Sequence, residues 1–172
     1  MIRPATERDI PQLAELIKEL ALYEKEPDAA IATAADIHDL LFVGSATPGG
    51  VPASYCHVAV DESQPDEVLG MALWFLNTST WLGKHGLYLE DLYVRDSARG
   101  QGYGQQLLAS LAAVCVERNY GRLEWWVLDW NSPAIDFYTS QGATPMSDWT
   151  TFRVSGPALT ELADRAQGSP NY

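Results

Sequence analysis

Three alternate glycines, Gly100, Gly102 and Gly104, follow an alternating apolar segment and directly precede an apolar stripe with helical spacing. Glycine lets the backbone come close to a ligand, and the first N–H groups of a helix have no partner inside the helix. Those donors and the helix dipole favour a bound anion such as a pyrophosphate. Residues 99–104 are therefore the first candidate for a binding site.

Other glycine motifs and metal motifs do not fit this chain. No Gly-Lys-Ser/Thr follows the glycines, which excludes a P-loop, and the third glycine comes one residue too early for the dinucleotide pattern GxGxxG. His38, His57 and His85 show no ligand spacing, and no motif supports a Ser–His–Asp triad. We therefore expect no metal site.

Two adjacent carboxylates, Glu90 and Asp91, precede the glycines on an expected strand. Strict alternation places them on opposite faces, Glu90 with Leu92 and Asp91 with Leu89 and Tyr93. A carboxylate beside a reacting centre can take the proton of an attacking amine. In the alternative interpretation, both carboxylates only hydrogen-bond a neighbouring loop.

The remaining pattern predicts the elements that position these groups. The expected helices cover residues 7–24, 33–41, 102–120, 132–141 and 157–166, and the expected strands 55–60, 68–76, 87–94, 123–128 and 149–154. Consecutive strands followed by a strand–helix–strand–helix–strand order predict a mixed α/β sheet with helices packed on it.

Composition limits the class of protein. The 172 residues are 47% apolar, which predicts one domain over residues 1–166 and a loose tail over 167–172. A net charge of −12 disfavours nucleic acid and anionic membranes as partners, and it would tolerate or attract a cationic one. On charge alone, the favoured interpretation is that the acidity only aids solubility. No apolar run is long enough to span a membrane, no secretory signal is present, and Cys56 and Cys115 form no CxxC pair. These features predict a cytoplasmic protein.

Three motifs together resemble the GNAT superfamily of N-acetyltransferases. The run 99–104, Arg-Gly-Gln-Gly-Tyr-Gly, matches the Arg-x-x-Gly-x-Gly pyrophosphate loop of that superfamily. Residues 2–6 with Asp9 resemble its opening, and residues 131–138, Asn-Ser-Pro-Ala-Ile-Asp-Phe-Tyr, followed by Gly142 resemble its closing motif. The resemblance implies a twisted, mostly antiparallel central sheet with helices on both faces.

Further stretches resemble one branch of the superfamily, the diamine (spermidine/spermine) acetyltransferases. They are residues 17–24, 81–91 and 129–131, and the stretches 79–83 and 127–131 look closest to the thialysine acetyltransferases. The polyamine enzymes carry an Asp-Pro before the tryptophan that matches Trp81, whereas this chain has Ser79-Thr80. The loss of that carboxylate favours a shorter amine with its own carboxylate, such as thialysine, lysine or ornithine.

The resemblance implies a cosubstrate, acetyl-CoA, and a role for each matching residue. Tyr138 would protonate the departing thiolate, and Glu90 would be the catalytic carboxylate on the amine side. The residues expected to bind acetyl-CoA are Leu92, Tyr93, Val94, Arg99, Gly100, Gln101, Gly102, Tyr103, Gly104, Gln105, Asn131, Ser132, Pro133 and Ala134. The residues expected to bind the amine are Tyr23, Glu24, Trp81, Glu90, Asp91, Glu124 and Trp149.

The expected partners are a small cationic amine and, because the resembling branch is dimeric, a second copy of this chain. Two alternatives stay open at this point. One is a non-catalytic acyl-CoA-binding domain on the same fold, which need not keep Tyr138 and Glu90. The other is an acetyltransferase for protein N-termini or lysine side chains, which an open groove would suit.

Overall fold

The computed structural model describes residues 1–167 of the chain. They belong to two compact units, of which the first ends at Trp130 and the second begins at Asn131. The first unit holds a five-stranded sheet with helices, and the second holds two helices. Mixed α/β structure is thus confirmed.

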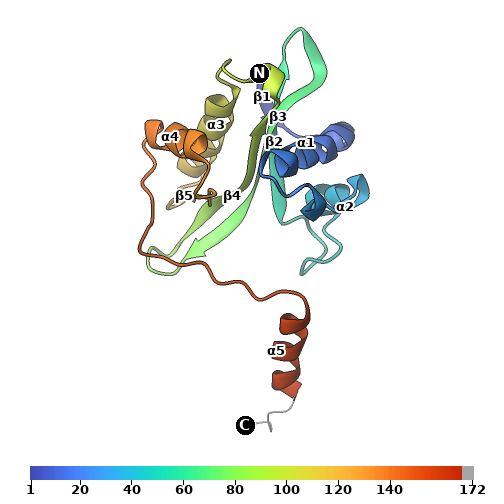
Figure 1. Cartoon of the computed structure of the whole chain (residues 1–172), viewed down its shortest axis with the longest axis vertical. Helices are drawn as coiled ribbons and strands as arrows, with labels where there is room; N and C mark the ends of the chain where they lie inside the picture. Colours follow the sequence, from blue (N-terminus) through green and yellow to red (C-terminus); the bar gives the residue numbers. More distant parts are fainter. Residues whose placement is uncertain (168–172) are drawn as a thin grey trace. The chain divides into compact units, whose positions relative to one another are not determined.

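The sheet of the first unit has the strand order β1-β2-β3-β4-β5 (Figure 1). Its strands are β1 (Ile2–Pro4), β2 (Ser54–Asp61), β3 (Gln64–Ser79), β4 (Lys84–Val94) and β5 (Leu123–Glu124). The first four are antiparallel in sequence order, and β5 runs parallel to β4. The mostly antiparallel sheet expected from the sequence is therefore present.

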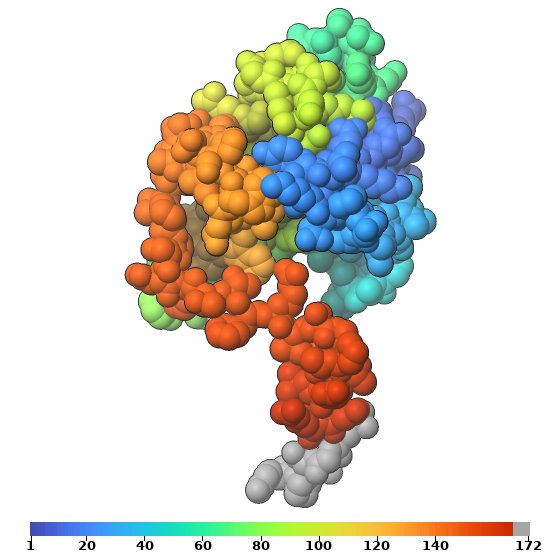
Figure 2. Space-filling view, in the orientation of Figure 1, coloured from blue at the N-terminus to red at the C-terminus, as the bar shows by residue number. Residues whose placement is uncertain are grey.

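Helices lie on both faces of this sheet. Helices α1 (Ile10–Tyr23) and α2 (Ala34–His38) lie on one side and α3 (Tyr103–Glu117) on the other (Figure 1). Short 3-10 turns, η1 (Glu7–Asp9), η2 (Pro27–Ala29) and η4 (Asp96–Ala98), and a π-turn, η3 (Asp39–Val43), connect them. Figure 2 shows α1 and α2 in blue, side by side over their face.

The core follows the alternation of the strands. One layer packs α1 and α2 against the sheet through Ile10, Leu13, Leu16, Ile37, Leu41, Cys56, Val58, Val60, Val68, Met71, Leu73 and Tyr93. Leu107, Leu108, Leu111 and Cys115 of α3 are also buried. Cys115 lies on the same buried face of α3 as the three leucines.

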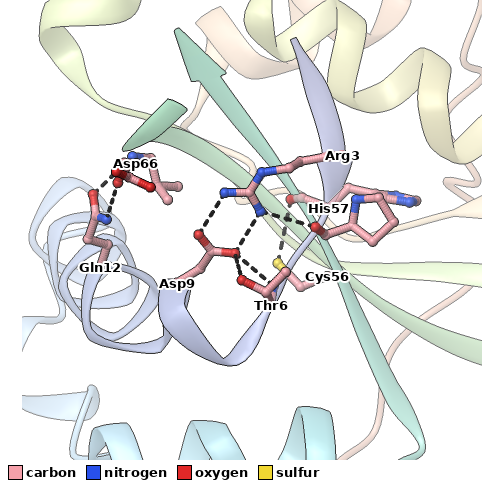
Figure 3. Close-up of polar contacts among 9 residues, drawn as sticks. Arg3, Thr6, Asp9, Gln12, Cys56, His57 and Asp66 are labelled. Atoms are coloured by element: carbon pink, nitrogen blue, oxygen red, sulfur yellow. Dashed lines mark hydrogen bonds and ion pairs between the residues drawn. The ribbon is translucent and has the colours of Figure 1, made fainter. Parts of the chain in front are cut away.

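A buried carboxylate, Asp9, fastens the start of α1 to the first strand (Figure 3). Its oxygens accept hydrogen bonds from both terminal nitrogens of Arg3, at 2.7 and 2.8 Å, and from the Thr6 backbone and hydroxyl. The Gln12 amide, one turn further along, donates through Nε2 to the Asp66 carbonyl and accepts the Val68 N–H at Oε1. Burial by itself raises the pKa of Asp9, but the bonds from Arg3 and Thr6 outweigh it and hold that pKa below its ordinary value.

We predict that Asp9→Asn lowers the free energy of unfolding by about 1–3 kcal/mol at neutral pH, because it leaves the Arg3 guanidinium without its ion-pair partner. The folded-state pKa of Asp9 lies below the unfolded one, so its stabilisation is complete above the unfolded value. It is lost as the pH falls through the folded value, below about 4. Urea unfolding at pH 7 and at pH 3 measures both effects.

Asp36→Asn is the matched control, because Asp36 caps α2 in the same Thr-x-x-Asp arrangement with Thr33 but is exposed. Asp36→Asn is expected to lower the free energy of unfolding by clearly less than Asp9→Asn does. If both variants lost the same free energy of unfolding, the buried ion pair of Asp9 with Arg3 would add no stability to that of the capping box.

The second unit contains α4 (Ser132–Ser140) and α5 (Pro157–Gln167). Asn131 precedes α4, its Oδ1 accepting the Ala134 N–H at 3.3 Å, and Pro133 stands in the first turn. Both features match the expected start of a helix at residue 132.

Two expected strands differ from the structure. β5 covers only Leu123 and Glu124 instead of 123–128, because only Leu87 and Tyr88 of β4 pair with it. Residues 149–154 are not a strand, since among residues 1–167 no strand edge pairs with them, and apolar alternation alone does not supply those hydrogen bonds. The loose tail expected over 167–172 falls, beyond Gln167, outside the described residues.

Candidate active site

A β-bulge lies at Glu90. Asp91 pairs with Leu73 of β3, whereas Leu89 pairs with Trp74, so Glu90 is left over on β4. Leu73 and Trp74 are neighbours on one strand and lie on opposite faces, and Asp91 and Leu89 must do the same. The expected sharing of a face by Asp91 and Leu89 is therefore wrong.

The bulge also overturns the expected separation of the two carboxylates. Glu90 follows Leu89 by one residue and consequently points to the side of Asp91, which is also the side of Tyr93 and α1. Strict alternation could not predict this, because an inserted residue reverses the parity of everything beyond it.

Asp91 has the most perturbed acidity of this region. Its burial, followed by the neighbouring charges of Glu90 and Glu24, raises the pKa of Asp91 to about 7. Glu24 follows the last residue of α1, and burial raises the pKa of Glu24 as well. Glu24, Glu90 and Asp91 form what we call the acidic cluster, and all were expected on the amine side.

The edge of β4 beyond the acidic cluster is open to a ligand. β5 pairs with β4 only at Leu87 and Tyr88, and from Leu89 to Val94 no other strand of the described chain pairs with that edge. Backbone N–H and C=O groups along an unpaired edge can bond an extended ligand as a further strand would. Leu92, Tyr93 and Val94, expected to contact acetyl-CoA, lie on this edge.

The glycine loop leads from η4 into α3. Gly100 and Gly102 have φ of 76° and 81°, in the left-handed region that favours glycine, and Gly102 is the N-cap of α3 without a side-chain cap. The N–H groups of Tyr103, Gly104 and Gln105 therefore begin the helix without an intrahelical partner. Gly104 lies inside α3. This geometry is of the kind that the expected anion site requires.

Arg99 turns its side chain toward aromatic residues. Its Nε donates to the Val94 carbonyl at 3.1 Å, and its guanidinium lies 4.8 Å from the centroid of the Tyr23 ring and 5.4 Å from that of Tyr93. Tyr23 also lies 6.3 Å from Trp130. Tyr23 was expected to bind the amine and Arg99 to bind acetyl-CoA, and the two side chains are thus in direct contact.

Sequence reasoning missed Glu19 and Arg95, which connect α1 to the end of β4. Arg95 lies 3.2 Å from Glu19, and burial together with the charges of Asp96 and Glu19 raises the pKa of Tyr93. A signal was available, because Glu15, Glu19 and Tyr23 recur every four residues on α1.

Two other expected amine ligands of the first unit lie elsewhere. Glu124 pairs with Arg122 at 2.9 Å and accepts a hydrogen bond from Asn77, so its charge is already compensated. Trp81 lies in the turn between β3 and β4 and is 91% exposed. Asp91 is seven residues beyond the start of β4, roughly 23 Å along the strand. In that turn the Ser79 hydroxyl accepts the Leu82 N–H at 3.2 Å, so Ser79 closes the turn.

The remaining expected residues belong to the second unit. Asn131 is buried and, with Ser132, Pro133 and Ala134, starts α4. Tyr138 is half-buried near the end of that helix, with its ring 5.3 Å from Phe137. Trp149 follows a turn, outside the helices of this unit, and is 71% exposed.

Residues 1–167 have neither a metal-binding group nor a membrane-spanning helix. They contain no group of three or more His, Cys, Asp or Glu side chains placed to hold a metal ion. None of the helices in the described part of the chain is long and apolar enough to cross a bilayer.

Chemically, this region combines three capabilities on one strand and the loop after it. A carboxylate that titrates near neutrality can accept a proton, an unpaired strand edge can hold an extended ligand and polarise a carbonyl, and a helix N-terminus can bind an anion. The acidic cluster favours a cation on the side of α1.

Comparison with known proteins agrees with this chemistry. Residues 13–143 match the model of the acetyltransferase (GNAT) family. A thialysine N-epsilon-acetyltransferase of Bos taurus is 36% identical over 96% of this chain and 98% of its own length. An L-ornithine N5-acetyltransferase of Arabidopsis thaliana is 30% identical over 94% of this chain and 86% of its own. A solved integron cassette protein of V. cholerae superposes with a TM-score of 0.76 at 29% identity, covering 95% of this chain and 96% of its own.

Proposed function

Since this chain belongs to the GNAT family of acetyltransferases and is an N-acetyltransferase acting on amines, we propose that its acceptor is a small cationic amino acid. The proposed class is thialysine, lysine or ornithine, with diamines and polyamines as poorer acceptors. The acetyl donor of this family is acetyl-CoA.

The acidic cluster is the observation that carries the proposal. Glu24, Glu90 and Asp91 gather on one side of β4, and the same strand continues into the glycine loop after η4. Three carboxylates attract an ammonium and repel an anionic substrate. The net charge of −12 extends the same preference over the whole chain.

The proposed reaction moves one acetyl group directly between donor and acceptor. Asp91 takes a proton from the ammonium, and the free amine attacks the carbonyl carbon of the thioester. An N–H of the β4 edge stabilises the oxyanion, the C–S bond breaks, and Tyr138 gives its proton to the thiolate. The nitrogen loses its second proton as the amide forms, and through solvent that proton restores the Tyr138 phenol. Glu90 holds the amine. The sequence favours Glu90 as the catalytic carboxylate on the amine side, whether as a base or as a substrate ligand. We propose Asp91 for the base role because it is the carboxylate with a pKa of about 7.

The cofactor is proposed to lie along the edge and the loop. The backbone of Leu92, Tyr93 and Val94 would pair with the pantetheine arm, and residues 99–105 would bind the pyrophosphate. Residues 131–134 of the second unit would contact the far part of the arm. The unpaired edge of β4 and the left-handed Gly100 and Gly102 support this placement.

The acceptor class is proposed from the turn between β3 and β4. Where the polyamine enzymes carry Asp-Pro, this chain has Ser79-Thr80, and the Ser79 hydroxyl is used inside the turn. This chain therefore lacks the carboxylate that the polyamine enzymes have at this sequence position, although the turn itself lies roughly 23 Å from Asp91 along β4. A shorter acceptor does not need that carboxylate.

We expect purified protein with acetyl-CoA to acetylate thialysine, lysine or ornithine with a kcat/KM at least tenfold above that for spermidine. The measurement is thiol release across a panel of these amines, diamines and an N-terminal peptide. A preference for spermidine would refute the acceptor class, a preference for the peptide would establish the protein-directed alternative, and acetyl-CoA binding without turnover of any amine would refute the proposed function.

Three broader expectations are also part of the proposal. We propose that residues 1–166 act as one acetyltransferase domain, which the family match over 13–143 supports because it covers most of the first unit and continues into the start of the second. We propose a homodimer, supported by the exposed Trp149 and Phe152, and sedimentation tests it. We propose the cytoplasm, which suits the free thiols of Cys56 and Cys115.

A further inference from the structure

One face of α1 carries Glu15, Glu19 and Tyr23 at four-residue intervals, a set we call the α1 stripe. Arg95, just after β4, reaches the first two, at 3.2 Å from each carboxylate. Its Nε also donates to the Val68 carbonyl, which fixes the guanidinium on the sheet. The α1 stripe is thus attached to the segment that precedes the glycine loop.

Arg99, the first residue of the glycine loop, also contacts the α1 stripe. The Tyr23 ring covers its guanidinium at 4.8 Å, while Val94 and Asp96 bind its nitrogens at 3.1 and 2.8 Å. A guanidinium held by a carbonyl, a carboxylate and an aromatic face has few alternative positions.

Tyr93 joins the two contacts. Its ring lies 5.4 Å from the Arg99 guanidinium, and burial, the charge of Asp96 and the charge of Glu19 in the α1 stripe raise its pKa. Figure 2 shows the yellow-green atoms of the segment between β4 and α3 next to the blue atoms of α1. The end of α1 that leads to Glu24 is therefore tied to the start of the glycine loop.

We propose that Tyr23 is a positioning residue for acetyl-CoA as well as a neighbour of the amine. Its ring holds Arg99 and thereby keeps the glycine loop in the conformation that binds the pyrophosphate. The inference rests on the proposed cofactor placement. Because coupling between two sites is reciprocal, a cofactor that orders Arg99 also orders Tyr23 and Glu24 for the amine.

The test is the dissociation constant of acetyl-CoA, measured by calorimetry without any amine. Tyr23→Leu is expected to raise it roughly two- to fivefold, the loss of one exposed cation–π contact. Tyr23→Phe keeps the ring and is expected to bind like the wild type. Tyr23→Met provides a second ring-free variant should the leucine variant fold poorly, with thermal melting as the check.

A double-mutant cycle separates positioning from general damage. Added to Arg99→Met, Tyr23→Leu is expected to cause no further loss, because the partner of the ring is already gone. Lys25→Met is the matched control, since it removes a cation 4.2 Å from the Trp130 ring at the same helix end and is expected to leave acetyl-CoA binding unchanged.

Unchanged binding in both ring-free variants would overturn the inference, as would full additivity with Arg99→Met. These outcomes are distinct from failure of the proposed function. An inactive amine panel combined with the expected binding pattern would refute only the proposed acceptor reaction, whereas a wild type that does not bind acetyl-CoA would refute both.

Discussion

Tyr138→Phe is expected to lower kcat by roughly one to three powers of ten, about 1.4 kcal/mol of activation free energy for each, while the dissociation constant of acetyl-CoA stays near that of the wild type. The variant removes only the hydroxyl, so the ring keeps its packing 5.3 Å from Phe137. The departing thiolate would then have to take its proton from water. Steady-state turnover combined with calorimetry measures the two quantities.

Tyr120→Phe is the matched control. Tyr120 also loses only a hydroxyl, its ring lies against His85, and it has no proposed role in the reaction. Its kcat should equal that of the wild type. If Tyr138→Phe retained wild-type kcat, the acid would have to be another group, and the match of residues 131–138 would indicate only a helix start.

The second large effect concerns the pH profile. Burial and the charges of Glu90 and Glu24 raise the pKa of Asp91 to about 7, and a base must be ionised to accept a proton. The kcat/KM for the amine should therefore rise with pH through about 7. Asp91→Asn should lower kcat/KM at least tenfold at pH 8. It should also remove the acidic limb of the profile, which is the rise of kcat/KM through pH 7.

Glu90→Gln is the comparison within the same bulge. Because Glu90 is proposed to hold the amine, this variant should raise the KM for the amine and keep the acidic limb, shifted toward lower pH by the loss of a neighbouring negative charge. If Glu90→Gln abolished the limb and Asp91→Asn kept it, the two roles would have to be exchanged.

Asp91 also has a signature in stability. Its folded-state pKa of about 7 lies above the ordinary value of 3.8, so the folded protein binds the proton more tightly than the unfolded chain does. Asp91 therefore causes stability to decline as the pH rises from about 4 to about 7. Asp91→Asn should be more stable than the wild type at pH 8, so reduced activity would not reflect unfolding.

Local chemistry explains what was predictable. Left-handed glycines before a helix, a Thr-x-x-Asp box and a Pro after an Asn cap each act within a few residues. Accordingly, α3 with its glycine loop, the start of α1 and the start of α4 all lie near their expected positions. The motifs of Arg99–Gly104 and residues 131–138 likewise identified the family.

Long-range pairing explains what was missed. The bulge at Glu90 results from the register of β4 against β3, which no alternation within β4 reveals. Glu124 was expected to bind the amine, but Arg122, just before β5, and Asn77 of β3 already compensate its charge. The length of β5 depends on how many residues of β4 pair with it.

The sequence by itself determined the glycine loop that opens α3, the acetyl-transfer chemistry that its motif indicates, and the residues available for it, because backbone conformation and capping depend on near neighbours. Only the tertiary structure decided which carboxylate has a pKa near neutrality and that Tyr23 touches Arg99. Both depend on burial and on charges from α1, β3 and β4, and that environment exists only once the sheet register is set and α1 has packed on it.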